Sequence, residues 1–285
     1  MAKVSIVDAK RGNASLDSSV RRAVGLIGGI SKFIKKGDRV LVKPNFNSDD
    51  PFPASSDPAF VKAAILLIRK AGAKEVVIGE SSGPFWKPTR RVMQNTGMAK
   101  VAAELGVEIR YFDELEHVYK EIPKAKHLCG VYVTTELSRY DRLVYLCCMK
   151  THLNARFTLS MKLAMGFPKT TDRLKMHMHD LEEKIAELNL LMRPDLILMD
   201  GRKCFVTGGP ASGTVEEPGV ILASTDRVAI DVEAIKILQS YGARNQLDMP
   251  VLKLPMIRRA IEIGIGKPGE AVREKDKKTT RSKKK

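Results

Sequence analysis

The chain has 285 residues, of which 44% are hydrophobic and 29% charged, and this balance is typical of a globular protein rather than a disordered chain. Its apolar runs are far shorter than the roughly 18 residues that cross a bilayer. The first residues also lack the apolar region of a signal peptide. We therefore expect no membrane span and a cytoplasmic location. The formal net charge of +16 favours anionic ligands.

Apolar runs that are typical of strands alternate with helical patterns along the chain. The strand patterns cover residues 1–8, 40–42, 76–78, 107–111, 143–148, 196–199 and 220–223. The helical patterns cover residues 16–34, 58–71, 89–105 (with a break at 95–97), 155–165, 181–192 and 228–238. Such alternation predicts an α/β fold in three layers, α/β/α, around a mostly parallel sheet.

Two segments depart from this alternation. Residues 113–135 are irregular and end in an alternating stretch, Leu128–Val133, so we expect an edge hairpin or a small inserted lobe there. Residues 273–285 contain eight Lys or Arg, two acids and no apolar residue. They predict a disordered basic tail after a single domain of residues 1–272. This tail is either a solubilising extension or a nonspecific contact for nucleic acid.

Polar side chains follow four of the predicted strands at the point where each apolar run ends. They are Lys43 and Asn45, then Glu80, Ser81 and Ser82, then Lys150 and His152, and finally Asp200. In open parallel sheets, ligands bind beyond the carboxyl ends of the strands. The sequence therefore predicts one site at this edge of the sheet.

Lysine and histidine dominate this predicted site. Lys43 and Lys150 can neutralise a phosphate or carboxylate or act as bases, and His152 can shuttle protons near neutral pH. We predict these three as catalytic residues, the alternative being surface lysines at strand ends. The predicted anion-binding residues are Asn45, Glu80, Ser81, Ser82 and the loop glycines Gly208 and Gly209.

Metal binding is a second hypothesis for the same edge. The chain has five histidines, and three of them, His152, His177 and His179, fall at or near the predicted site. Together with Asp200 they form a candidate ligand set for a divalent metal. The alternative is that His177 and His179 lie in an exposed loop.

Several cofactor classes are disfavoured. The four cysteines include no Cys-x-x-Cys pair, so we expect no iron–sulfur cluster to be ligated by this chain. The chain also lacks the glycine-rich motifs of ordinary dinucleotide and P-loop sites. The identity of any cofactor stays open.

A set of motifs resembles the domain-of-unknown-function family 362. They are Val40–Phe46, Lys150–His152, Met165–Gly166, Asp200–Gly201 and Ser224–Asp231. Many members of that family carry a ferredoxin-type cysteine module, so the resemblance implies that the protein acts together with redox proteins. This chain has no such module, and an iron–sulfur role would need a separate protein partner.

Three function classes follow. The leading hypothesis is an enzyme of open reaction class that binds a small anionic substrate or cofactor at the strand carboxyl ends, with or without a metal. The alternative is a non-catalytic binding or adaptor protein for a redox or iron–sulfur partner. Nucleic-acid binding is the third, but a 6% aromatic content gives no stacking pattern for it.

Overall fold

The computed structural model describes residues 1–10, 15–83 and 87–274, and a ten-stranded sheet runs through it. Eight strands follow one another across the sheet in the order β12 (Glu270–Arg273), β1 (Lys3–Asp8), β11 (Val220–Ser224), β9 (Leu196–Phe205), β7 (Arg142–His152), β2 (Arg39–Lys43), β3 (Glu75–Glu80) and β4 (Ile109–Tyr111). Two short strands extend it as hairpin partners, β10 (Val215–Glu216) beside β9 and β8 (Arg156–Thr158) beside β7.

The centre of this sheet is parallel. Strands β9, β7, β2, β3 and β4 run in one direction, whereas β11 is antiparallel to both of its neighbours. The predicted mostly parallel sheet is therefore confirmed. Because parallel strands bring their carboxyl ends to the same edge, β2, β3 and β7 present their last residues there together.

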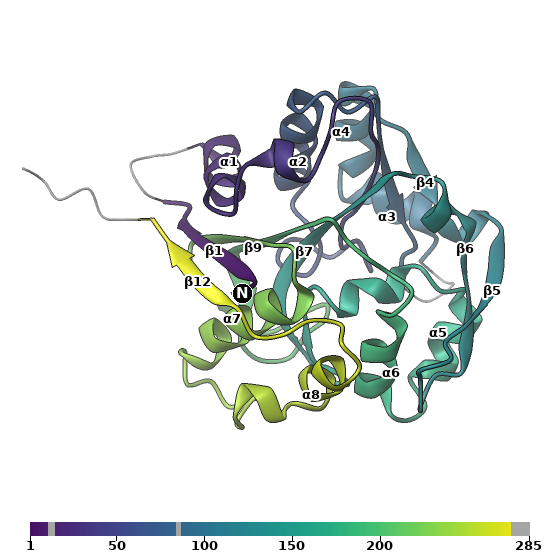
Figure 1. Ribbon diagram of the computed structural model, residues 1–285, viewed down its shortest axis with the longest axis vertical. Helices are drawn as coiled ribbons and strands as arrows, with labels where there is room; N and C mark the ends of the chain where they lie inside the picture. Colours follow the sequence, from purple (N-terminus) through teal and green to yellow (C-terminus); the bar gives the residue numbers. More distant parts are fainter. Residues whose placement is uncertain (11–14, 84–86, 275–285) are drawn as a thin grey trace, which may run out of the picture.

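Helices cover both faces of the sheet (Figure 1). One face packs against α1 (Leu16–Leu26), α2 (Pro58–Lys70), α3 (Thr89–Asn95) and α4 (Met98–Leu105), and the other against α6 (Leu181–Leu188), α7 (Arg227–Gln239) and α8 (Pro255–Glu262). Side chains alternate between these two cores along each strand, as in β2, where Val40 and Val42 enter one core and Leu41 the other. The three-layer prediction is confirmed.

The helix boundaries follow local capping chemistry. Helix α2 begins as predicted, with Pro58 as its first residue and the Asp57 carboxylate accepting the N–H of Ala59 at 2.8 Å. The first predicted helix is shorter than its pattern. It ends at Leu26, because Gly28 and Gly29 take positive φ angles of 121° and 85°, and a 3-10 turn, η2 (Ile30–Lys32), follows.

One predicted helix, residues 155–165, is wrong. Strand β7 continues to His152 and turns back into β8, with Lys150 opposite Thr158. After β8 the chain forms a 3-10 helix, η5 (Lys162–Gly166), and then a short helix, α5 (Thr170–Met176). The apolar spacing reflects a buried hairpin and loop rather than a helix face.

The irregular segment forms a separate two-stranded sheet of β5 (His117–Glu121) and β6 (Gly130–Thr134), within the predicted range 113–135. Short 3-10 helices occur at η3 (Phe112–Glu114), η4 (Thr135–Ser138) and η6 (Val251–Lys253). Of the predicted basic tail, Arg273 closes β12 and Glu274 pairs with Arg22, whereas 275–285 lie outside the described residues. Across the described residues, every helix is too short or too polar to span a membrane.

Candidate functional site

A cavity of about 430 Å³ lies beyond the carboxyl ends of β2, β3 and β7. Lys43 ends β2 and Glu80 ends β3, while Lys150 and His152 come from the last residues of β7. The segment η5 and helix α5 close the other side, and Pro210 reaches in from the loop after β9. The cavity therefore combines three strand ends with the η5–α5 segment, of which only His177 had been predicted as a site residue.

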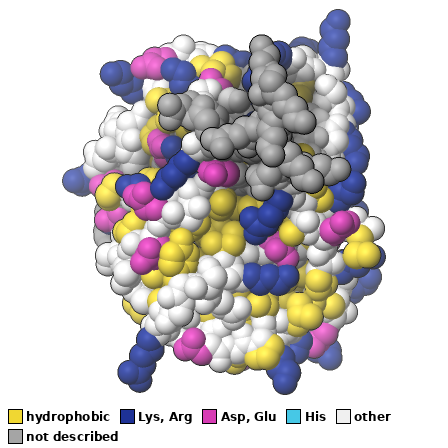
Figure 2. All heavy atoms as spheres, turned by 90° about the vertical axis from the view of Figure 1, so that its left-hand side faces the viewer, with side chains coloured by type: hydrophobic (Ala, Val, Ile, Leu, Met, Phe, Trp, Pro, Cys, Tyr) yellow, Lys and Arg dark blue, Asp and Glu magenta, His cyan; other side chains and the backbone are white. Residues whose placement is uncertain are grey.

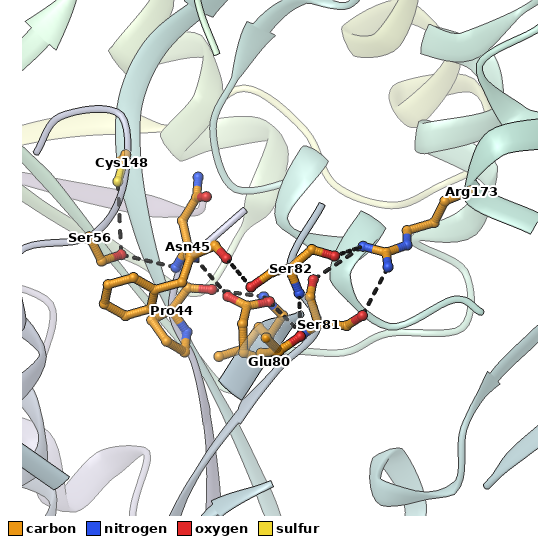
Figure 3. Close-up of polar contacts among 11 residues, drawn as sticks. Pro44, Asn45, Ser56, Glu80, Ser81, Ser82, Cys148 and Arg173 are labelled. Carbon is orange, nitrogen blue, oxygen red and sulfur yellow. Dashed lines mark hydrogen bonds and ion pairs between the residues drawn. The ribbon is translucent and has the colours of Figure 1, made fainter. Parts of the chain in front are cut away.

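A buried ion pair forms the floor of this cavity. The Lys43 ammonium lies 2.5 Å from Oε1 of Glu80, and both side chains are only 2% exposed. The remaining lone pairs of Glu80 accept the N–H groups of Ser81 at 2.9 Å and Phe46 at 2.8 Å (Figure 3). Burial lowers the pKa of Lys43, and the Glu80 carboxylate opposes this shift. Both carboxylate oxygens of Glu80 are thus occupied by Lys43 and by backbone N–H groups.

Arg173 connects α5 to the end of β3. One terminal nitrogen donates to the carbonyl oxygens of Ser81 and Ser82 at 3.1 and 2.8 Å, and the other donates to the hydroxyls of Ser81 and Thr170 at 2.9 and 2.8 Å (Figure 3). Burial lowers the pKa of Arg173. The guanidinium fixes the cavity wall and adds a positive charge to it, with neutral partners only.

Lys150 holds two loops together at another wall. Its ammonium donates to the carbonyl oxygens of Ala54 and of Pro210, the latter at 2.9 Å. Burial is also the main cause of its lowered pKa. Like Arg173, Lys150 donates its hydrogen bonds to neutral groups, and among the described residues neither cation forms a direct ion pair with a carboxylate.

Lys162 differs from the other three cations. Its ammonium makes no hydrogen bond or ion pair with any residue in the described part of the chain. Burial lowers the pKa of Lys162 to about 7, and the charges of Lys150 and Arg173 act in the same direction. This lysine therefore brings to the cavity an unpartnered amino group whose pKa lies near neutral pH.

Buried hydrogen bonds position Lys162. The Asp231 carboxylate, on α7, accepts the N–H groups of Ser160 at 2.8 Å and Met161 at 3.0 Å. The Asn189 side chain donates to the carbonyl of Met161 at 2.9 Å. Asp231 is fully buried, and burial raises its pKa to about 7. The residues just before Lys162 are therefore held by Asp231 of α7 and by Asn189, which directly follows α6.

We expect Asp231 to make stability depend on pH between about 4 and 7. The unfolded carboxyl ionises near pH 4 and the folded one near 7, so its contribution to stability is complete below pH 4 and is lost as the pH rises to 7. The loss is on the order of 3–4 kcal/mol. Urea unfolding of the wild type and of Asp231→Asn from pH 4.5 to 7.5 measures it as the pH-dependent part of their difference. A constant difference across that range would contradict the prediction.

The two histidines of the cavity, His152 and His177, are different tautomers. Nδ1 of His152 accepts the N–H groups of Asn154 at 3.0 Å and Ala155 at 3.2 Å, so we assign the ring proton to Nε2. Nδ1 of His177 lies 2.7 Å from the carbonyl oxygen of Arg173, which only accepts, so Nδ1 carries the proton there. Burial lowers both pKa values, that of His152 to about 2, so both rings are neutral at pH 7.

The structure brings together most, but not all, of the residues predicted from the sequence. The cavity is lined by seven of them: Lys43, Asn45, Glu80, Ser81, Lys150, His152 and His177. Ser82 lies behind this wall, where its hydroxyl donates to the carbonyl of Phe46 at 2.6 Å. Gly208 and Gly209 are not lining residues; Gly209 packs directly against the backbone of Thr151.

The predicted metal ligands are not assembled. His179 is 70% exposed and pairs with Asp180. The Asp200 carboxylate forms an ion pair with the Arg202 guanidinium at 2.7 Å. Within residues 1–10, 15–83 and 87–274, no three His, Cys, Asp or Glu side chains are grouped so that they could hold a metal ion. His152 and His177 are the two members of the set that reach the cavity.

Two charged residues of the cavity had not been predicted, Lys162 and Arg173. Lys162 is the one charged residue in the apolar run Leu159–Met165, and a lone lysine in such a run is a usable signal for a half-buried cation. Arg173 carries no comparable signal, because its surroundings in sequence are polar and resemble those of any surface helix.

Comparison with known proteins supports the motif-based family prediction. The model of the family described as "Domain of unknown function (DUF362)" matches residues 40–236, a range that includes every charged residue of the cavity. The chain is also 28% identical over 233 residues to the thylakoid-associated protein sll1697 of Synechocystis sp., across 79% of this chain and 70% of that protein.

Proposed function

The chain belongs to the domain-of-unknown-function family 362, and we propose that its cavity binds a small anionic ligand through a carboxylate or phosphate group. The main support for this proposal is the balance of charge on the described residues that line the cavity. Lys43, Lys150, Lys162 and Arg173 bring four positive groups, whereas Glu80 is the single carboxylate. Burying charge without a counter-ion is costly, and a bound anion would supply that counter-ion.

Free hydrogen-bonding groups accompany this charge. The hydroxyl of Thr158 is buried and has no partner within the described residues. The side-chain amide of Asn45 points away from the polar network at the end of β3 (Figure 3), and it lines the cavity. Sites that bind and orient a carboxylate or phosphate commonly combine neutral hydrogen-bond donors with cations.

The face shown in Figure 2 gives less support to nucleic-acid binding. On this face, Lys and Arg side chains lie both at the edge and near the middle, and Asp and Glu side chains lie among them. A nucleic-acid interface usually has a continuous basic stripe.

Anion binding should take up protons. The free Lys162 has a pKa of about 7, and an anion beside it raises that pKa, so binding at pH 7 should take up about half a proton. Affinity should then fall about tenfold per pH unit above pH 7. Calorimetric titration with pyruvate and with sulfate, in two amine buffers of different ionisation enthalpy, measures both effects.

Neither pyruvate nor sulfate titrates near pH 7, so any proton taken up on binding goes to the protein. The relative affinities of the two probes then distinguish a carboxylate site from a phosphate site. Tighter binding of pyruvate would identify a carboxylate site, and tighter binding of sulfate a phosphate site. Absence of binding by both at millimolar concentration would contradict the proposed function. Binding without proton uptake would show that the ligand does not reach Lys162.

A further inference from the structure

The two cavity histidines offer opposite groups to a ligand. With Nδ1 of His152 occupied by two backbone N–H groups, its Nε2–H is a hydrogen-bond donor. With Nδ1–H of His177 donated to the Arg173 carbonyl, its Nε2 is an acceptor with a free lone pair. Both rings line the same cavity, and each is held by backbone, so neither state depends on a mobile side chain.

Lys162 lies close to both rings. Its charge contributes to the lowered pKa of His152 and to that of His177. Burial is the main cause that keeps both histidines neutral, and the charge of Lys162 acts in the same direction, which preserves one ring as a donor and the other as an acceptor. Glu80, the acid among the described lining residues, is bound to Lys43 and cannot compete for this role.

We propose that the cavity is catalytic, and that it removes a proton from the carbon next to the carbonyl group of a small carboxylate. This inference rests on the proposed anion binding. Nε2 of His177 accepts the proton, while Nε2–H of His152 and the Lys162 ammonium donate to the carbonyl oxygen on which negative charge develops. A neutral imidazole and a cation aimed at such an oxygen are established means of stabilising an enolate.

The step is balanced without an added reagent. The C–H bond breaks, its electron pair forms the carbon–carbon double bond of the enolate, and the carbonyl π electrons move to oxygen. The proton resides on His177 and returns to the same carbon or to another one. No oxidant or reductant takes part, so the reaction class is isomerisation or proton exchange.

The ring states can be tested without a ligand. Long-range proton–nitrogen spectra of the protein with ¹⁵N-labelled histidine distinguish the two tautomers, and His152→Gln and His177→Gln identify the two signals by their loss. We expect an Nε2–H ring for His152 and an Nδ1–H ring for His177 at pH 7. The reverse tautomer of either ring, or a protonated ring, would overturn the proposal.

The chemistry is tested with 2-oxoacids in deuterated water. Pyruvate and 2-oxoglutarate should lose the proton signals next to their carbonyl groups, and His177→Gln should slow this exchange at least 100-fold, as expected for loss of a general base. His179→Gln is the matched control and should exchange at the wild-type rate, because His179 is 70% exposed and outside the cavity.

Binding must be measured in parallel by calorimetry, because it separates two failures. A 2-oxoacid that binds the wild type without catalysed exchange would overturn this inference and leave the proposed anion binding intact. If neither 2-oxoacid nor sulfate binds, the proposed function and this inference fail together. Exchange that persists in His177→Gln would overturn the assignment of the base.

Discussion

Lys162→Met is expected to weaken pyruvate binding by about 10- to 100-fold while making the folded protein more stable. The loss of affinity corresponds to one hydrogen bond to a charged group, about 1.5–3 kcal/mol. It should be accompanied by loss of the proton uptake, since Lys162 is the cavity group with a pKa of about 7 that an anion would raise. Calorimetric titration measures both quantities.

The gain in stability has a separate cause. Lys162 has no counter-charge among the described residues, and its pKa of about 7 shows that the fold disfavours its protonated form. That penalty is complete below pH 7 and disappears above about pH 10, where the unfolded lysine is neutral too. Methionine has a similar length and no charge, so we expect a gain of about 1–2 kcal/mol at pH 6.

Lys175→Met is the matched control for Lys162→Met. Lys175 lies on α5, its side chain is 76% exposed, and it pairs weakly with Asp172 at 3.6 Å. The control should leave both affinity and stability within about 0.5 kcal/mol of the wild type. If Lys162→Met bound pyruvate as tightly as this control, the ligand would not contact Lys162.

The strand-end rule led to the edge of the sheet at which the cavity lies, because the rule depends on topology. Lys43 and Glu80 follow runs of buried apolar residues, and parallel pairing brings these two residues together. The rule placed Asp200 wrongly for a physical reason. The apolar run ends at Met199, but β9 continues to Phe205, and Arg202 binds the Asp200 carboxylate within the strand.

The side of the site formed by β8, η5 and α5 could not be predicted from local sequence patterns. The spacing of residues 155–165 predicted a helix, whereas the chain pairs β8 with the end of β7 and then forms η5. That choice depends on Asp231, which lies 69 positions beyond Lys162 and holds the Ser160 and Met161 backbone. Contacts over such a distance in sequence leave no periodic signal.

Glu80→Gln is expected to destabilise the protein by about 3–5 kcal/mol, the cost of leaving a buried charge without its partner. The amide oxygen of the glutamine can still accept from Lys43, beside the Pro44 carbonyl at 2.8 Å, but it carries no negative charge, and the amide NH2 faces the Phe46 N–H as a second donor. The space around the pair is tight, since a methyl group on Gly166 would lie 2.7 Å from the Lys43 nitrogen and 2.9 Å from Oε1 of Glu80. Urea unfolding at pH 7 measures the effect.

The double variant Lys43→Met/Glu80→Gln distinguishes an unpaired charge from a simple loss of packing. Removing both charges also removes the uncompensated ammonium, so the double variant should be more stable than Glu80→Gln alone, with a coupling energy of about 1–3 kcal/mol. If the effects of the two substitutions merely added, the ion pair would contribute no interaction of its own. The floor of the cavity would then depend on the hydrogen bonds of Glu80 to the N–H groups of Phe46 and Ser81, and Lys43 would be a ligand-facing cation rather than a structural one.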